Sequence, residues 1–192
     1  MAARIAAIGA WSLVWMAVPG AQTRWIDIER SMVTVHVSAS EKAGMGVPGY
    51  VIEAPLAEGS VDDTDTPHLA LVINVQQLRI AELRRSSEEG RKLYAAMLGP
   101  EGLDSERFSR ITYHSLTVDP IEADGWLVQG ELQIQDRFVP LDIHAARHGD
   151  RFTGTTTFLL NDFGISSTSA AEVTTTVDYE LRVDFNIVLE TP

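Results

Sequence analysis

Residues 177–189 read VDYELRVDFNIVL, and this stretch decides the fold class. Every second side chain from Val177 to Leu189 is apolar or aromatic, and the residues between them are mostly charged or polar. Because side chains alternate between the two faces of a β-strand, the stretch predicts one long strand with an apolar and a polar face. Such a strand is typical of a curved sheet that closes over its own interior rather than a flat sheet coated by helices.

The same period of two residues recurs in most segments upstream. The predicted strands carry their inward positions in these sets: Val33, Val35 and Val37; Leu69, Leu71, Ile73 and Val75; Ile111, Tyr113 and Ser115; Trp126, Val128, Gly130, Leu132 and Ile134; Val139, Leu141, Ile143 and Ala145; Phe152, Gly154, Thr156, Phe158 and Leu160. Asp136-Arg137 and His148-Gly149-Asp150 are predicted turns that join the last three sets into a meander. We therefore expect an all-β, antiparallel barrel domain over residues 22–192.

Helical spacing is confined to one region of the chain. Leu93, Tyr94, Met97 and Leu98 fall on one helical face within residues 87–98, and Gly99-Pro100 ends the pattern. A second short helical turn is expected over residues 101–106. The barrel is thus predicted to carry one or two short helices.

The first 21 residues have the form of a signal peptide. Arg4 precedes an apolar run from Ile5 to Val18, and Pro19-Gly20-Ala21 supplies the small residues of a cleavage site. The run is shorter than the roughly 20 residues that a membrane-spanning helix needs. We predict a periplasmic or secreted protein with no membrane span after signal removal, with an uncleaved anchor or a buried helix as the alternatives.

Composition excludes several classes of partner and site. The formal charge is −12, so no nucleic-acid partner is expected, because such binding needs clustered Lys and Arg. There are no cysteines, and the five histidines form no helical His-x3-His pair. His144 and His148 come nearest to a metal-binding pattern. No metal and no cofactor is predicted.

The common catalytic signatures are also missing. There is no Gly-x-Ser-x-Gly elbow, P-loop or dinucleotide fingerprint, and Asp162-Phe163-Gly164 matches a kinase tripeptide without the rest of the kinase set. The paired carboxylates Asp62-Asp63 are expected in a solvated, turn-rich segment. No catalytic residue is predicted, and an enzyme that uses Asp162 with His114 or Tyr179 is kept as an alternative.

Four stretches together carry a resemblance to a known family. They are Trp25-Ile26-Asp27 with Ser31; Met97-Leu98-Gly99-Pro100 through Leu103-Asp104, Arg107-Phe108 and Ile111; Gly130-Glu131-Leu132 with Val139-Pro140-Leu141; and Asp162-Phe163-Gly164-Ile165 before the final strand. Their order and spacing resemble the YceI-like proteins across nearly the whole mature chain. The resemblance implies a lipocalin-like barrel in the periplasm that binds polyisoprenoids or other lipids.

The chain departs from that pattern in two places. Related sequences often carry a His-rich segment after the first strand, where residues 44–50 here read GMGVPGY. The Ser/Arg often found before the Asp-Phe-Gly-Ile stretch is replaced by Leu160-Asn161. Any role tied to those histidines, or to a polar head-group contact at that position, does not transfer to this chain.

An isoprenoid tail needs an apolar tunnel and almost no hydrogen-bonding partners, which agrees with the absence of catalytic and phosphate-binding motifs. The implied function is a non-enzymatic carrier that holds an isoprenoid or other long-chain lipid. The residues predicted to line the barrel are Val35, Leu71, Ile73, Tyr113, Trp126, Val128, Phe158, Tyr179, Leu181 and Phe185. The same apolar faces also fit a packed, ligand-free barrel that serves as a structural or stress-related interaction module, because a barrel of eight strands can be filled by its own side chains. A homodimer is left open.

Overall fold

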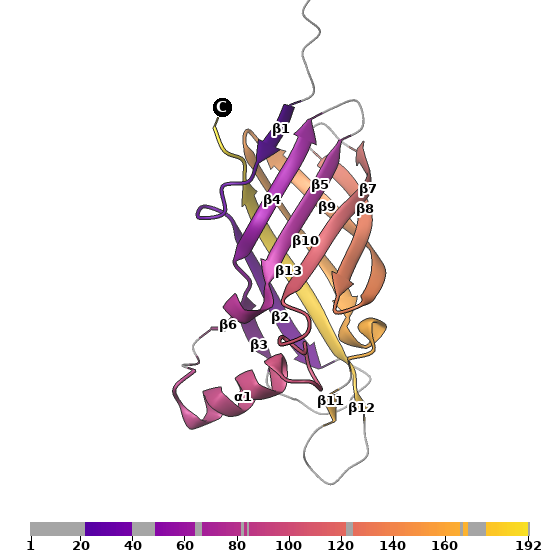
Figure 1. Cartoon of the computed structure of the whole chain (residues 1–192). Coiled ribbons are helices and arrows are strands. Elements are labelled where there is room, and N and C mark those ends of the chain that lie inside the picture. The colour runs from indigo at the N-terminus through magenta and orange to yellow at the C-terminus, as the bar shows by residue number, and fades with distance from the viewer. Residues whose placement is uncertain are drawn as a thin grey trace, which may run out of the picture.

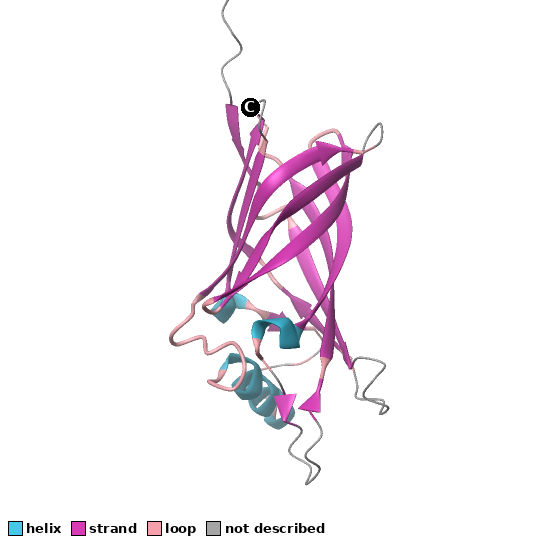
Figure 2. Cartoon of the chain, turned by 90° about the vertical axis from the view of Figure 1, so that its right-hand side faces the viewer, coloured by secondary structure: helices cyan, strands magenta, loops and turns pink. Residues whose placement is uncertain are grey.

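The computed structural model describes residues 22–39, 49–63, 67–81, 83, 85–121, 125–165, 167–168 and 176–191. In this part of the chain an antiparallel sheet curls around a central axis, and a helix lies across one end (Figure 1, Figure 2). The predicted fold class, an antiparallel barrel with one or two short helices, is confirmed. The predicted signal peptide, residues 1–21, lies outside the described residues and stays a prediction.

The elements follow the chain in a simple order. The strands are β1 (Gln22–Trp25), β2 (Met32–Ala39), β3 (Tyr50–Glu53), β4 (Leu56–Asp63), β5 (His68–Asn74), β6 (Arg79–Ile80), β7 (Arg110–Pro120), β8 (Gly125–Ile134), β9 (Arg137–His148), β10 (Arg151–Leu159), β11 (Ser167–Thr168), β12 (Thr176–Val177) and β13 (Tyr179–Val188). The helix is α1 (Glu88–Leu98), and two 3-10 helices are η2 (Val75–Gln77) and η3 (Leu160–Phe163). β11 and β12 pair only with each other.

The sheet closes on itself at the end where β1 begins, which we call the upper end (Figure 1). β1 pairs with β4, and directly after β1 the backbone of Ile26 pairs with Leu189 beyond β13. The Asp27 N–H donates to the Val188 carbonyl at 2.8 Å, and the Glu190 N–H donates to the Trp25 carbonyl at 2.9 Å. Since β13 also pairs with β10, the ladder runs β1-β4-β5-β7-β8-β9-β10-β13 and returns to the β1 segment, which removes the exposed edge.

A bend at residues 27–31 lets one segment of chain serve both ends of the barrel. Beyond the bend β2 pairs with β13 and with β3, so β1 and β2 form one interrupted strand opposite β4 and β3. The buried Ser31 hydroxyl holds the bend, because it accepts a hydrogen bond from the Val188 N–H at 2.9 Å. Gly59 gives the necessary room, since a Cβ there would stand 2.7 Å from Ile26 Cδ1.

The sequence predicted most strands but not all of them. The expected segments correspond to β2, β5, β7, β8, β9, β10 and β13, except that Val75 and Leu160 lie in η2 and η3 and Val177 lies in β12, which pairs with β11. β1, β3, β4, β6 and β11 were not predicted, and residues 62 and 63 form the end of β4, where the backbone of Asp62 pairs with that of His68, rather than a turn-rich loop. α1 lies where helical spacing predicted it.

The predicted helical turn over residues 101–106 is wrong. These residues form hydrogen-bonded turns in which the Leu103 N–H donates to the Met97 carbonyl and the Ser105 N–H donates to the Leu98 carbonyl. Asp104 has a φ of 44°, which is incompatible with a right-handed helix. The turns therefore fold back onto the end of α1 instead of continuing as a helix.

The buried side chains on the inner face of the barrel form two clusters. One group surrounds the closing strands and includes Ile26, Val33, Leu56, Ile187 and Leu189. The other lies under the β7–β9 meander and includes Tyr113, Leu132, Ile143, Phe163 and Ile165. Among the described residues, no helix has the length and apolarity to span a membrane.

Candidate functional site

Three cavities follow one another inside the described part of the barrel. The upper cavity measures about 100 Å³, the central cavity about 140 Å³ and the lower cavity, beside α1, about 270 Å³. The upper and central cavities share the wall residues Leu71, Ile143 and Phe185. The central and lower cavities share the wall residues Ile52, Leu103, Leu160 and Leu181. Because neighbouring cavities share wall residues, the three cavities form a row through the barrel interior, divided at two places by the shared side chains, and we call this row the tunnel.

The wall of the central cavity offers almost no polar atom to a ligand. Only Tyr113 and Thr156 among its lining residues carry a polar side-chain group. The Thr156 hydroxyl donates to the Asp142 carbonyl at 2.9 Å. The Tyr113 hydroxyl lies 3.2 Å from the Val128 carbonyl oxygen and 3.1 Å from that of Leu141. Both hydroxyls are bonded to backbone, so the cavity suits an apolar group.

Tyr113 is kept neutral by its surroundings. Burial raises the pKa of its phenol above the ordinary value, and the negative charge of Asp142 raises it further. A phenolate in this cavity would lie in apolar surroundings next to two carbonyl oxygens. Tyr113 therefore acts as an uncharged wall residue and not as a base.

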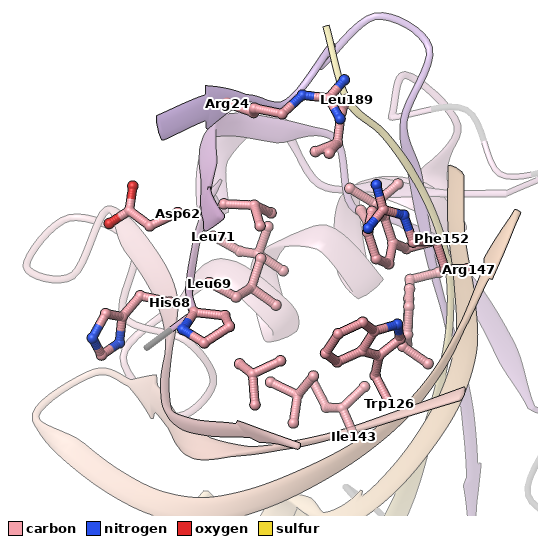
Figure 3. Close-up of a pocket in the computed structure, with 17 residues that line it drawn as sticks. Arg24, Asp62, His68, Leu69, Leu71, Trp126, Ile143, Arg147, Phe152 and Leu189 are labelled. Carbon is pink, nitrogen blue, oxygen red and sulfur yellow. The ribbon is translucent and has the colours of Figure 1, made fainter. Parts of the chain in front are cut away.

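The upper cavity is lined by residues near the upper termini of β1, β4, β5, β8, β9 and β10, and Figure 3 shows it in close-up. Its floor is apolar and includes Leu69, Trp126 and Phe152. Its rim also carries the charged or polar side chains Arg24, Asp62, His68 and Arg147. Figure 3 shows Asp62 and His68 pointing away from the cavity, whereas the two arginines lie along its rim. The mouth is thus apolar within and cationic at its edge.

The lower cavity lies between the barrel and α1. Leu93, Ala96 and Met97 of α1 form one side of it, and Tyr179 and Leu181 of β13 contribute to the other. Glu101 is the one charged residue that lines this cavity in the described part of the chain. α1 lies below the barrel (Figure 2), and its apolar side chains close one side of the lower cavity as an amphipathic lid.

α1 is attached to the barrel through one buried tyrosine. The Tyr94 hydroxyl accepts a hydrogen bond from the Ile80 N–H of β6 at 2.7 Å. The Arg85 guanidinium lies 4.3 Å from the centre of the Tyr94 ring and donates to the Gln76 and Leu78 carbonyls. The helix begins at the Ser87 cap, whose hydroxyl accepts from the Gly90 N–H. These contacts fix the position of the helix against the lower cavity.

The structure places all ten predicted lining residues on the tunnel wall. Trp126 and Val128 line the upper cavity, and Tyr179 lines the lower one. The central cavity is lined by Val35, Leu71, Ile73, Tyr113, Phe158, Leu181 and Phe185. That these residues contact a ligand stays a prediction.

Sequence reasoning missed several of the residues at the two ends of the tunnel. Leu93 and Met97 of α1 were recognised as one helical face but not as part of a cavity. Arg147 extends the inward series of β9 by one position beyond Ala145, a signal that the sequence does contain. Arg24 lies before the first residue that was assigned to a pattern, and nothing in the local sequence indicates its inward direction.

The residues weighed for catalysis are not brought together. Tyr179 lines the lower cavity, whereas His114 is exposed on β7 and Asp162 is exposed on η3, and neither lines any of the three cavities. Among the described residues, no group of three or more His, Asp or Glu side chains is placed to hold a metal ion. In the part of the chain that the structure describes, the three cavities offer apolar containment.

The sequence matches the model of the YceI-like domain over residues 26–189. The chain belongs to the YceI-like family. No curated protein sequence matches this YceI-like protein.

Two solved structures share the fold of this YceI-like protein. BcnA from Burkholderia cenocepacia is 17% identical with a TM-score of 0.59, and the match covers 86% of this chain and 99% of BcnA. A polyisoprenoid binding domain from Saccharophagus degradans, implicated in plant cell wall breakdown, is 13% identical with a TM-score of 0.55. That match covers 90% of this chain and all of the domain, at 100%. At these identities the likeness establishes the fold.

Proposed function

We propose that this protein binds a long-chain lipid of the polyisoprenoid type inside its barrel and carries or sequesters it in the periplasm. The observation that carries the proposal is the tunnel, in which successive cavities share apolar wall residues such as Phe185 and Leu181. A packed barrel would have filled this space with its own side chains. Apolar cavities of about 150 Å³ in proteins stay dry and bind apolar molecules.

The energetics of such a site are favourable without any polar recognition. Burying about 20 methylene-sized groups at roughly 0.8 kcal/mol each gives about 16 kcal/mol before association costs. Those costs amount to roughly 4–15 kcal/mol, so an apolar chain alone supports binding from weak to tight. The hydroxyls of Tyr113 and Thr156 need no ligand, because backbone carbonyls satisfy them.

Similarity to known proteins supports the same ligand class. The Saccharophagus degradans domain that shares the fold is described as polyisoprenoid binding. The apolar run from Ile5 to Val18, followed by small residues, supports export and thus a periplasmic or secreted location. A non-enzymatic role agrees with a tunnel wall whose polar groups are satisfied by backbone.

A variant that blocks the tunnel tests the proposal. Leu181 lines both the central and the lower cavity, so Leu181→Trp places an indole at the narrowing between them. Glu180→Trp is the matched control, because Glu180 is exposed on the opposite face of β13. The measurement is native mass spectrometry of each protein expressed from the full chain, followed by titration with geranylgeraniol.

The expected result is a co-purifying lipid in the wild type and in Glu180→Trp, and its loss in Leu181→Trp. Thermal unfolding of the three proteins checks that the blocked variant is folded, and Leu181→Phe provides a smaller obstruction if it is not. A wild-type protein that is recovered empty and does not bind geranylgeraniol would overturn the proposal and favour the ligand-free interaction module.

A further inference from the structure

Two strands carry an arginine at the inward position nearest the upper mouth. On β9 the inward series that includes Ile143 and Ala145 continues with Arg147. On β1 Arg24 shares the inward face with Ile26, because Trp25 between them points outward with 60% of its surface exposed. Both arginines line the upper cavity (Figure 3). The apolar tunnel thus ends in two guanidinium groups.

Arg24 is largely buried and only partly satisfied. Its side chain is 17% exposed, and one terminal nitrogen donates to Asp150 Oδ1 and to the Glu190 carbonyl, both at 2.9 Å. Its Nε is buried and has no hydrogen-bond partner. These contacts hold the guanidinium at the rim, and the ion pair with Asp150 leaves the two groups together without net charge.

Arg147 has donors to spare. Its Nε donates to the Gly149 carbonyl at 3.0 Å, and its guanidinium lies 5.3 Å from the centre of the Phe152 ring. In the described part of the chain its two terminal nitrogens have no hydrogen-bond acceptor, and no carboxylate forms an ion pair with it. A cation at an apolar rim with unused donors is placed to bind an anion.

The other charged or titratable residues that line the tunnel do not offer a second cationic site. Asp62 and His68 also line the upper cavity, but Figure 3 shows both pointing away from it. At the opposite end, the lower cavity is lined by Glu101 and by no cation of the described residues. Among the described residues, Arg147 at the upper end is therefore the lining arginine without an ion-pair partner, whereas the charged group that lines the lower cavity is the carboxylate of Glu101.

We infer that the upper mouth is a head-group site for an anionic head, a phosphate monoester or a carboxylate, on the lipid whose tail fills the tunnel. The inference rests on the proposed function. Arg147 donates from its free terminal nitrogens to the oxygens of the head, and Arg24, whose charge is paired with Asp150, forms another part of the rim. The apolar floor with Trp126 and Phe152 strengthens this attraction, because it lowers the local dielectric constant. The protein's formal charge of −12 repels anions at long range, so recognition of an anion requires such a local cationic site.

The test compares three probes with the same tail: geranylgeranyl phosphate, geranylgeranoic acid and geranylgeraniol. The protein is expressed from the full chain and freed of co-purifying lipid, and dissociation constants are measured by displacement of a fluorescent long-chain probe. The wild type should bind the phosphate or both acids at least about tenfold more tightly than the alcohol, as expected for a charge-assisted contact. Preference for both acids assigns a general anion site, and preference for the phosphate alone assigns a phosphate site.

Variants at the upper mouth show which residue causes the preference for the acids over the alcohol. Arg147→Gln should remove most of the preference for the acids over geranylgeraniol, and Arg147→Lys should restore part of it. Arg151→Gln is the matched control, because Arg151 carries the same charge on the same hairpin but is exposed on the outer face. The variant Arg24→Gln is less suitable alone, since it also breaks the contacts to Asp150 and Glu190.

The outcomes separate the two proposals. Equal affinity for the alcohol and the acids, with tight binding of all three, overturns the anion site and leaves the lipid-binding function intact. An equal loss in Arg147→Gln and Arg151→Gln also overturns it, because the effect would then be one of overall charge. Failure to bind any of the three probes overturns the proposed function and this inference with it.

Discussion

The ring of Tyr113 occupies the space in front of Gly130. A Cβ on Gly130 would stand 2.6 Å from the Tyr113 hydroxyl oxygen and 2.7 Å from its Cζ. Because Gly130 has no side chain, the tyrosine of β7 reaches across β8, where its hydroxyl meets the carbonyls of Val128 and Leu141. One side chain thereby connects three neighbouring strands beside the central cavity.

Gly130→Ala should destabilise the barrel. The added methyl group would also lie 2.4 Å from the His114 carbonyl oxygen, so both the backbone and the tyrosine must move. We expect a loss of about 1–3 kcal/mol in the free energy of unfolding, typical of an overpacked site, measured by urea denaturation. Gly149→Ala is a useful comparison, because Gly149 has φ 66° but no atom within 4 Å of its added Cβ, which isolates backbone strain. A Gly130→Ala variant as stable as the wild type would contradict the packing argument.

Tyr113→Phe should remove an alkaline sensitivity of the fold. A tyrosine in the unfolded chain has a pKa of about 10, and burial raises the pKa of Tyr113 in the folded state. Above about pH 10 the unfolded chain therefore releases a proton that the folded protein keeps, so the free energy of unfolding falls as the pH rises. Below that pH the contribution is fully present and constant.

The measurement for Tyr113→Phe is urea denaturation from pH 7 to 11. At neutral pH the substitution should cost about 0.5–1.5 kcal/mol, because the Val128 and Leu141 carbonyls lose the hydroxyl that donates to them. The difference between wild type and variant should then shrink above about pH 10. A difference that stays constant over the whole range would show that ionisation of Tyr113 does not contribute.

The wall of the barrel was predictable because its signal is local. In β8 and β9 the inward residues, from Val128 to Ala145, follow the period of two without interruption, and pairing in register keeps every one on the same face. The ten predicted lining residues come from such segments. No long-range information is needed to assign their face once the strand is recognised.

The missed strands carry interruptions of that period. Pro55 separates β3 from β4, and a bulge between Leu56 and Glu58 shifts the register by one residue, so alternation fails across the segment. Gly59 follows, and it has no side chain because Ile26 occupies the space that a Cβ would need. The closing contact of Ile26 with Leu189 joins residues at opposite ends of the chain, and no local pattern encodes it. For the same reason the inward direction of Arg24 could not be predicted.

Ser31→Ala tests how the barrel closes. The Val188 N–H donates to the Ser31 hydroxyl at 2.9 Å in a buried position, and the substitution leaves that N–H without a partner. We expect a loss of about 1–3 kcal/mol in the free energy of unfolding. Ser38→Ala is the control, since Ser38 is exposed on β2, and it should change stability by less than about 0.5 kcal/mol. A Ser31 variant as stable as the control would mean that the bend does not depend on this hydrogen bond.

Tyr94→Phe should loosen α1 and speed the release of a bound lipid. The substitution removes the hydroxyl that accepts from the Ile80 N–H at 2.7 Å, and that buried N–H is left unpaired. Because α1 forms one side of the lower cavity, we expect faster hydrogen exchange in the helix and a dissociation rate for geranylgeraniol that rises about three- to tenfold.

Lys92→Ala is the matched control for this prediction. Lys92 lies on the exposed face of α1 and pairs with Glu88 at 2.9 Å, a contact worth only about 0.2–0.5 kcal/mol to the helix itself. It touches neither the barrel nor the lower cavity, so its removal should leave the dissociation rate unchanged. If both variants released the lipid at the wild-type rate while Tyr94→Phe exchanged faster, the lipid would leave through the upper mouth, and α1 would be a fixed wall rather than a lid.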